Sequence, residues 1–201
     1  MLFDPSAMTD SARRAGHRLA IPLSIAALAT LLQLAGGAEA WRLERGLVLN
    51  EPWRLATGQL VHLGWAHLLM NLGGLAVVWA LFGRDLEARQ WGAAIVACGL
   101  GVGAGLLGFS PGLDWYAGFS GILHGLLAAA IVVRVCRRPA PLDLLLAAAL
   151  AAKLVLEQTG GGAAGTAQLI GGGVAFDAHL YGALAGAAVG GLLAVRRRAA
   201  P

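Results

Sequence analysis

The sequence predicts an all-α, polytopic membrane protein with six transmembrane helices. The first observation is composition, because 58% of the 201 residues are hydrophobic and only 13% are charged. Soluble proteins carry about 25% charged residues, so a soluble domain of this size could not cover such a core. The second observation is that the apolar residues fall into six successive segments, separated by charged or Gly/Pro-rich breaks.

These six segments are the expected helices of one membrane-embedded bundle. Several are shorter than the ~20 residues that span a bilayer, but six in succession argue against buried helices of a soluble protein. We expect a cytoplasmic segment over 1–18, a membrane domain over 19–195 and a basic cytoplasmic tail over 196–201. The segments are Leu19–Ala35, Leu63–Phe82, Trp91–Leu107, Ser120–Val133, Leu142–Leu156 and Leu180–Val195.

The first segment has two interpretations. Arg13, Arg14 and Arg18 precede it and Gly37–Ala40 (GAEA) follows it, an arrangement typical of a cleaved signal peptide. Its long basic region and nearly span-length apolar run instead favour a retained transmembrane helix, which is our expectation.

The placement of arginines predicts the orientation in the membrane. If the N-terminus is cytoplasmic, eleven arginines lie inside and three outside, a clear positive-inside bias. Both termini are therefore expected in the cytoplasm. The inside set is Arg13, Arg14, Arg18, Arg84, Arg89, Arg134, Arg137, Arg138, Arg196, Arg197 and Arg198, and the outside set is Arg42, Arg45 and Arg54.

Charge and cysteine content exclude several classes of function. The net charge of +4 does not predict nucleic-acid binding, because the arginines lie at segment ends and form no stripe. Cys98 and Cys136 belong to different segments, so we expect no disulfide between them. No other residues have metal-ligand spacing, and we expect neither a metal nor a cofactor.

Polar residues on three different segments are expected at one depth. His67 lies near the start of the second segment with Asn71, Ser120 opens the fourth, and His179 precedes the sixth. At about 1.5 Å per residue these groups lie roughly 21–26 Å above the arginine that ends each segment. Polar groups inside a membrane are costly and usually functional, so agreement in depth indicates a shared site near the outer surface.

Glycines on two of these segments predict close helix packing. Gly182, Gly186 and Gly190 form a four-residue stripe on the sixth segment, and Gly121 and Gly125 lie on the fourth. Small residues at this spacing let helix backbones approach closely. Such an approach would bring His179 near Ser120.

A serine and a histidine at one depth indicate nucleophilic catalysis. A serine hydroxyl needs a base to take its proton, and we expect Ser120 as nucleophile and His179 as base. His124 competes for the second role, because it lies one helical turn after Ser120, but that choice leaves His179 unexplained. Asp177 falls on a different helical face from His179, so a Ser–His dyad is expected rather than a triad.

Acyl transfer also requires hydrogen-bond donors for the developing oxyanion. His67 and Asn71 are four residues apart and share one helical face. The backbone N–H of Ser120 is free if a helix begins there. These three groups are the expected oxyanion donors.

These motifs resemble those of the rhomboid family of intramembrane serine proteases, over about Trp53 to Val195. The resemblance rests on "PWRLATGQLVHLGWAHLLMN" with its H-x-x-x-N, on "GFSG" around Ser120, on "AHLYGALAG" around His179 and on "DLEARQWG" after the second segment. It implies a six-helix fold, Ser120 as nucleophile, His179 as base, and Gly118, Gly121 and Gly182 as supporting residues.

One departure narrows the resemblance. Typical bacterial rhomboids carry a tyrosine four residues after the nucleophile, packed on the catalytic histidine, and this chain has His124 there. The pattern is similar to the rhombosortase branch. That branch implies membrane-anchored substrates whose C-terminal tail holds a Gly-Gly motif, one transmembrane helix and a basic cluster. It also implies the bacterial inner membrane, with membrane lipid around the chain and a site that opens to the periplasm.

Two features and two rival functions stay open at this point. Lys153 and Glu157 are either a snorkelling lysine with its partner or substrate contacts. Residues 158–173 are expected to form a long flexible linker, which either caps the site or has no role in it.

An inactive rhomboid-like protein and a small transporter are the alternative functions. The presence of both Ser120 and His179 argues against the first, and the lack of inverted halves against the second.

Overall fold

The computed structural model describes residues 5–160 and 164–198, with the side chains of 19–160 and 166–195. The terminal arginines Arg13, Arg14, Arg18 and Arg196–Arg198 have side chains outside the described set, as do the ends of the expected terminal segments. In the described chain the elements are α1 (Pro5–Leu34), α2 (Gly37–Trp41), β1 (Leu43–Glu44), α3 (Arg54–Thr57), α4 (Trp65–Phe82), α5 (Ala88–Phe109), β2 (Trp115–Tyr116), α6 (Ser120–Arg137), α7 (Pro141–Gln158), α8 (Ala164–Ile170) and α9 (Phe176–Arg198).

The mostly helical chain is a multi-pass membrane protein. In the described part, the helices α4, α5, α6 and α9 are long and apolar enough to cross a bilayer. The first and fifth expected segments also lie in helices, α1 and α7. The apolar stretch of α1, Leu19–Leu34, is shorter than these spans, and α7 contains Asp143, Lys153 and Glu157. The count of six spans therefore stays a prediction.

Large apolar side chains cover the outside of the bundle. Such residues on a soluble surface would form a patch far larger than monomers usually tolerate, whereas lipid accommodates them. Examples from α1, α4, α5, α7 and α9 are Leu23, Leu69, Leu100, Leu144 and Leu192, each more than half exposed.

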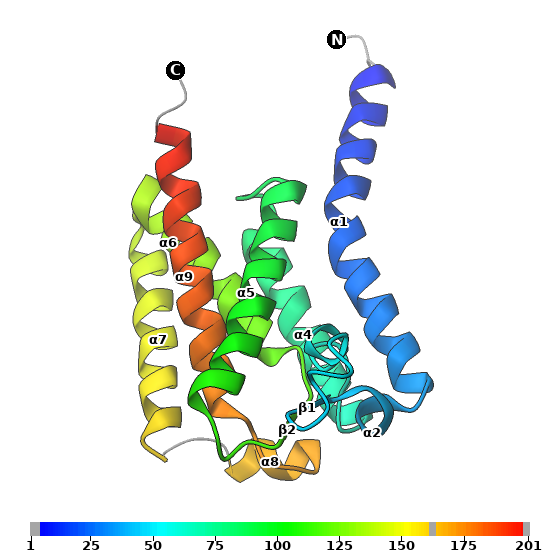
Figure 1. The fold of residues 1–201 in the computed structure, drawn as a ribbon. Helices are drawn as coiled ribbons and strands as arrows, with labels where there is room; N and C mark the ends of the chain where they lie inside the picture. Colours follow the sequence, from blue (N-terminus) through cyan, green and yellow to red (C-terminus); the bar gives the residue numbers. More distant parts are fainter. Residues whose placement is uncertain (1–4, 161–163, 199–201) are drawn as a thin grey trace.

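The helices run alternately up and down (Figure 1). The first residues of α1 and the last residues of α9 lie at one end of the bundle, with the short elements α2, α8, β1 and β2 at the other. Helix α6 is the most deeply buried of the four spans. Because α6 and α9 both begin at the end with the short elements, Ser120 and the first turn of α9 lie there together.

Backbone contact between α6 and α9 explains the glycine stripe. A Cβ on Gly182 would collide with the backbone of Gly121, and one on Gly186 with the backbone of Gly125. At Gly190 it would lie 2.6 Å from the carbonyl oxygen of Ala129. The expected close approach of the two helices is therefore present, and it fixes the separation between their first turns.

The chain that leads into α6 is fixed by polar contacts at the same end of the bundle. The Arg45 guanidinium donates to four backbone carbonyl oxygens in the last turn of α5 and in the loop after it, those of Leu106, Leu107, Ser110 and Leu113. Strand β1 pairs antiparallel with β2, with Leu43 opposite Tyr116. These contacts anchor the loop that ends at Ser120.

The expectation of a long flexible linker over 158–173 is wrong for part of that segment. Residues 164–170 form α8, whose Thr166 and Ile170 contribute to the wall of a cavity beside Ser120. The sequence from Ala164 to Ile170 has only one glycine, Gly165, so a helix is possible there despite the glycine-rich flanks. Residues 161–163 lie outside the described residues.

Candidate active site

Ser120 is placed by a strained turn and a helix start. It is the first residue of α6, so its backbone N–H belongs to the turn whose donors have no partner inside the helix. Gly118 has a φ of 138°, and a Cβ there would lie 2.9 Å from Cε1 of His67. Only glycine fits this position, both in conformation and in space.

A buried tyrosine holds the same turn. The Tyr116 hydroxyl donates a 2.6 Å hydrogen bond to the carbonyl oxygen of Gly118. Burial raises the pKa of Tyr116 to about 12, so the phenol stays protonated and remains a donor. This residue was not singled out from the sequence.

His179 reaches Ser120 from the first turn of α9. Its Nε2 lies 2.9 Å from the Ser120 Oγ, within hydrogen-bonding distance, and its side chain is buried. The two residues are 59 positions apart in sequence, and the backbone contact between α6 and α9 brings them together. A hydroxyl and an imidazole at this distance can exchange a proton.

His124 contacts both members of this pair without bonding the hydroxyl. Its ring stacks on that of His179, with centroids 4.0 Å apart and planes at 14°. Its Nδ1 lies 2.7 Å from the backbone carbonyl oxygen of Ser120 and donates to it, since a carbonyl can only accept. The geometry thus favours His179 over His124 as the partner of Oγ.

No aspartate was expected to orient His179, but a glutamate contacts its ring in the structure. Glu157 Oε2 lies 3.0 Å from His179 Nδ1, and both side chains are 6% exposed. The other oxygen, Oε1, accepts a hydrogen bond from the Lys153 ammonium. This contact was not predicted, because Glu157 belongs to the last turn of α7, 22 residues before His179. Asp177, the nearby acid, instead bonds the Ser110 hydroxyl.

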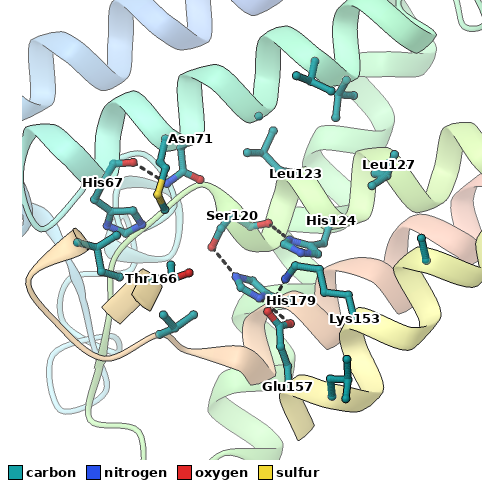
Figure 2. A pocket seen from close by; sticks show the side chains of 18 of the residues that line it. His67, Asn71, Ser120, Leu123, His124, Leu127, Lys153, Glu157, Thr166 and His179 are labelled. Atoms are coloured by element: carbon teal, nitrogen blue, oxygen red, sulfur yellow. Dashed lines mark hydrogen bonds and ion pairs between the residues drawn. The ribbon is translucent and has the colours of Figure 1, made fainter. Parts of the chain in front are cut away.

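His67 and Asn71 are buried on the face of α4 that looks toward Ser120 (Figure 2). The Leu63 N–H donates to His67 Nδ1 at 3.4 Å, which leaves the proton of a neutral ring on Nε2. The Asn71 amide nitrogen donates one hydrogen to the His67 carbonyl oxygen at 3.0 Å, and its second hydrogen remains available.

Two cavities meet at Ser120. The larger, about 770 Å³, lies among α4, α6, α7, α8 and α9, and its mostly apolar wall includes the polar groups drawn in Figure 2. The smaller, about 290 Å³, opens among loop residues that include Asp114 and Trp115. Ser120 and His67 line both, as do Ile170 and Val174. The hydroxyl is therefore reachable from the helix bundle and from the loop end.

Three groups near the hydroxyl are of the kinds that ligate metals. One ligand atom each from His124, Glu157 and His179 lies within 4.8 Å of the others. The two imidazoles are nearly parallel and stacked, so the lone pairs of their nitrogens point along separate planes rather than toward one point. His179 also has a partner at each nitrogen, an arrangement that suits proton transfer better than metal binding.

A second buried histidine, His62, packs against His67 and was not predicted. His62 is 1% exposed, and its ring meets that of His67 edge to face, with centroids 4.9 Å apart. Burial, together with the neighbouring His67, lowers the pKa of His62 to about 3. His62 is therefore a neutral ring that packs against His67.

Comparison with known protein families identifies a family to which the chain is similar. The family model described as Rhomboid domain matches residues 49–196. No curated protein and no solved structure matches the chain.

Proposed function

The chain belongs to the rhomboid family, whose members are generally intramembrane serine proteases, and on that basis we propose that it is a membrane-embedded endopeptidase. Ser120 is the proposed nucleophile and His179 the proposed base. The observation that carries this assignment is the 2.9 Å hydrogen bond between Ser120 Oγ and His179 Nε2 at the junction of two cavities. An inactive relative would have no need of this pairing.

The proposed reaction has two steps. In the first, His179 Nε2 takes the Ser120 proton while Oγ attacks a backbone carbonyl carbon, and the imidazolium then protonates the departing amine. In the second, a water gives a proton to Nε2 and its oxygen attacks the acyl carbon. Nε2 then returns this proton to Ser120 Oγ as the acyl bond breaks, which regenerates Ser120 and releases a new carboxyl terminus.

Three donors would stabilise the oxyanion in each step. They are the backbone N–H of Ser120, the Nε2–H of His67 and the free amide hydrogen of Asn71. Support comes from the turn at Gly118, which puts the His67 ring beside the start of α6, and from the Leu63 bond to His67 Nδ1. Donors held in place before the reaction need no reorganisation as charge develops.

The cavities suggest separate routes for the reactants. The larger cavity is lined by apolar residues of α4 and α7, such as Val77, Leu81 and Ala149, and suits an apolar substrate helix. The smaller one opens at the loop end beside Asp114 and suits entry of water. Lipid would surround the exposed apolar surface.

We assign the chain to the bacterial inner membrane, with both termini in the cytoplasm and six spans. The positive-inside distribution of arginines supports this orientation, and the common end of α1 and α9 (Figure 1) is compatible with it. Ser120, at the opposite end of the bundle, would then face the periplasm.

The proposed substrates are exported proteins with a C-terminal tail of the GlyGly-CTERM kind. His124 in the position of the usual tyrosine supports this choice. Proteolysis of ordinary single-span membrane proteins is the alternative, because the stack of His124 on His179 resembles the packing that the tyrosine provides.

A serine-directed fluorophosphonate tests the activity independently of the substrate. The full chain in detergent micelles should be labelled at Ser120, and neither Ser120→Ala nor His179→Ala should be labelled above background while both accumulate normally in membranes. Cys136→Ser, far from the site on the last turn of α6, serves as a matched control with wild-type labelling. Labelling of His179→Ala at the wild-type rate would contradict the assignment.

A further inference from the structure

The third group in line with the hydroxyl and the imidazole is a carboxylate. Ser120 Oγ contacts His179 Nε2 at 2.9 Å, and His179 Nδ1 contacts Glu157 Oε2 at 3.0 Å. These contacts join α6, α9 and α7, and Figure 2 shows them as one connected row. We propose that Glu157 is a positioning residue that makes a triad of the pair, an inference that rests on the proposed protease function.

The carboxylate fixes which nitrogen of His179 carries the proton. An ionised carboxylate only accepts hydrogen bonds, so Nδ1 must be the protonated nitrogen of the neutral ring. Nε2 is then the lone-pair nitrogen and can accept the Ser120 proton. Without Glu157 the two tautomers compete, and one of them cannot act as a base toward Oγ.

The carboxylate also stabilises the charge that forms on the ring. When Nε2 takes the proton, His179 becomes an imidazolium whose Nδ1–H still points at Glu157. Both side chains are 6% exposed, so water screens this attraction weakly. The same contact therefore favours the protonated ring during both steps of the reaction.

Lys153 explains how a carboxylate can be kept ionised here. A buried charge is costly unless it is paired, and the Lys153 ammonium bonds the second oxygen of Glu157. The lysine side chain is 47% exposed, so its ammonium reaches the buried acid from the surface of the bundle. A pair confined to α7 would join Glu157 to Lys153 alone. In the structure, the other oxygen of Glu157 contacts His179 on α9.

The remaining freedom of the ring is removed by its neighbours. His124 covers one face of His179 at 4.0 Å, and Phe176 lies at 6.2 Å with its ring tilted by 64°. Glu157 fixes rotation within the ring plane, and His124 fixes the plane itself. Both effects hold Nε2 on Ser120.

Rates of fluorophosphonate labelling separate a positioning role from a substrate contact, because the probe lacks any glycine-rich tail. Glu157→Gln should lower the rate at Ser120 about 10³–10⁴-fold. The residual labelling should have a different pH profile from that of the wild type, because the imidazolium loses the anion that stabilises it. Glu39→Gln, an exposed acid on α2, is the matched control and should label like the wild type.

Chemical rescue gives a readout that a merely structural residue would not affect. Glu157→Ala leaves space on the wall of the larger cavity, and added formate should restore part of its labelling rate, whereas formamide should not. Wild-type labelling with an unshifted pH profile in Glu157→Gln would overturn the triad and leave the protease intact. No labelling of the wild type at Ser120 would overturn both.

A further measurement uses the wild-type chain, so it does not depend on whether a Glu157 variant folds. In the wild-type chain, the proton on His179 Nδ1 should give a strongly deshielded resonance that is absent from His179→Ala. If the neutral ring instead carries its proton on Nε2, the proposed role of Glu157 is wrong.

Discussion

The imidazole of His124 lies flat on that of His179, with ring centroids 4.0 Å apart and planes at 14°. The stack joins the second turn of α6 to the first turn of α9 directly beside Ser120. It is possible because Gly121 and Gly182 let the two backbones touch. An aromatic face at position 124 therefore serves to hold the ring of His179.

Loss of that face should slow labelling of Ser120 without abolishing it. A stacked aromatic pair contributes about 0.5–1.5 kcal/mol, which corresponds to about a 2- to 12-fold change in rate. His124→Ala should show this decrease in the fluorophosphonate assay, and His124→Phe should stay closer to the wild type. A complete loss in His124→Phe would instead indicate that an imidazole nitrogen of His124 takes part.

Removal of one oxyanion donor should reduce cleavage strongly. His67→Ala and Asn71→Ala should each lower turnover of a tail reporter by about 10²–10³-fold, with little change in the amount of protein in the membrane. Leu69→Ala, on the exposed face of the same helix, is the control. Wild-type turnover in a double His67/Asn71 variant would exclude both residues from the site.

Even a methyl group between α6 and α9 should destabilise the protein. A Cβ on Gly186 would run into the backbone of Gly125, which cannot move aside as a flexible side chain could. Gly186→Ala should cost about 1–3 kcal/mol, measured as the free energy of unfolding in mixed detergent and SDS micelles.

The same helix supplies the control for that experiment. A Cβ on Gly191 meets nothing within 4 Å, so Gly191→Ala should be neutral or slightly stabilising, because alanine is the better helix former. Equal effects of the two substitutions would show that helix propensity, not contact with α6, governs this face.

The buried His62 should make the protein less stable in acid. Its pKa is about 3 in the folded chain and about 6.5 when unfolded. Below pH 6.5 the unfolded state therefore binds a proton that the folded state does not bind. The free energy of unfolding decreases until the pH nears 3. Between pH 7 and 5 this one group accounts for about 2 kcal/mol.

His62→Leu should remove that part of the pH dependence. The comparison is the difference in unfolding free energy between pH 7 and pH 5 in the variant and in the wild type. Other titrating groups contribute to both chains and cancel. An unchanged difference would mean that His62 is already protonated in the folded protein at pH 5.

Features of the fold and the site that follow from a helical period or a local motif could be predicted from the sequence. The positions of the long helices follow from the apolar segments, and the pairing of Ser120 with His179 from matched depth and the glycine stripe. Both rest on spacing along single helices and on packing at short range. The bounds of α4 and α6, Trp65–Phe82 and Ser120–Arg137, differ from the expected ones by a few residues at the ends.

Contacts between helices that share no motif could not be predicted. Glu157 meets His179 only because α7 ends beside the start of α9, and no spacing rule relates positions 22 residues apart across a loop. The sequence did contain a signal, because the alternating directions of the segments put Glu157 and Ser120 at the same face of the membrane. The helix α8 was missed because its glycine-rich flanks at 160–162 and 171–173 dominate the composition of the linker.

The choice of substrate should depend on how easily the substrate's helix unwinds. A helical backbone keeps its carbonyl groups in hydrogen bonds and cannot be attacked until it opens. Glycine is about 1 kcal/mol less favourable than alanine in a helix, so a Gly-Gly pair at the outer end of a tail would expose an extended carbonyl beside Ser120. Two glycines together make opening about 30-fold more favourable than two alanines.

The test uses an exported reporter fused to a tail with a Gly-Gly motif, one transmembrane helix and terminal arginines, coexpressed with this chain. Cleavage should release the reporter, and replacement of Gly-Gly by Ala-Ala should block release. A reporter with an ordinary single-span rhomboid substrate segment is the comparison, and His124→Tyr should shift cleavage toward it. Ser120→Ala shows that release requires this chain. Equal release from the glycine and alanine tails would reject the tail specificity and retain only a general rhomboid protease, because the substrate helix would then open without help from its own sequence.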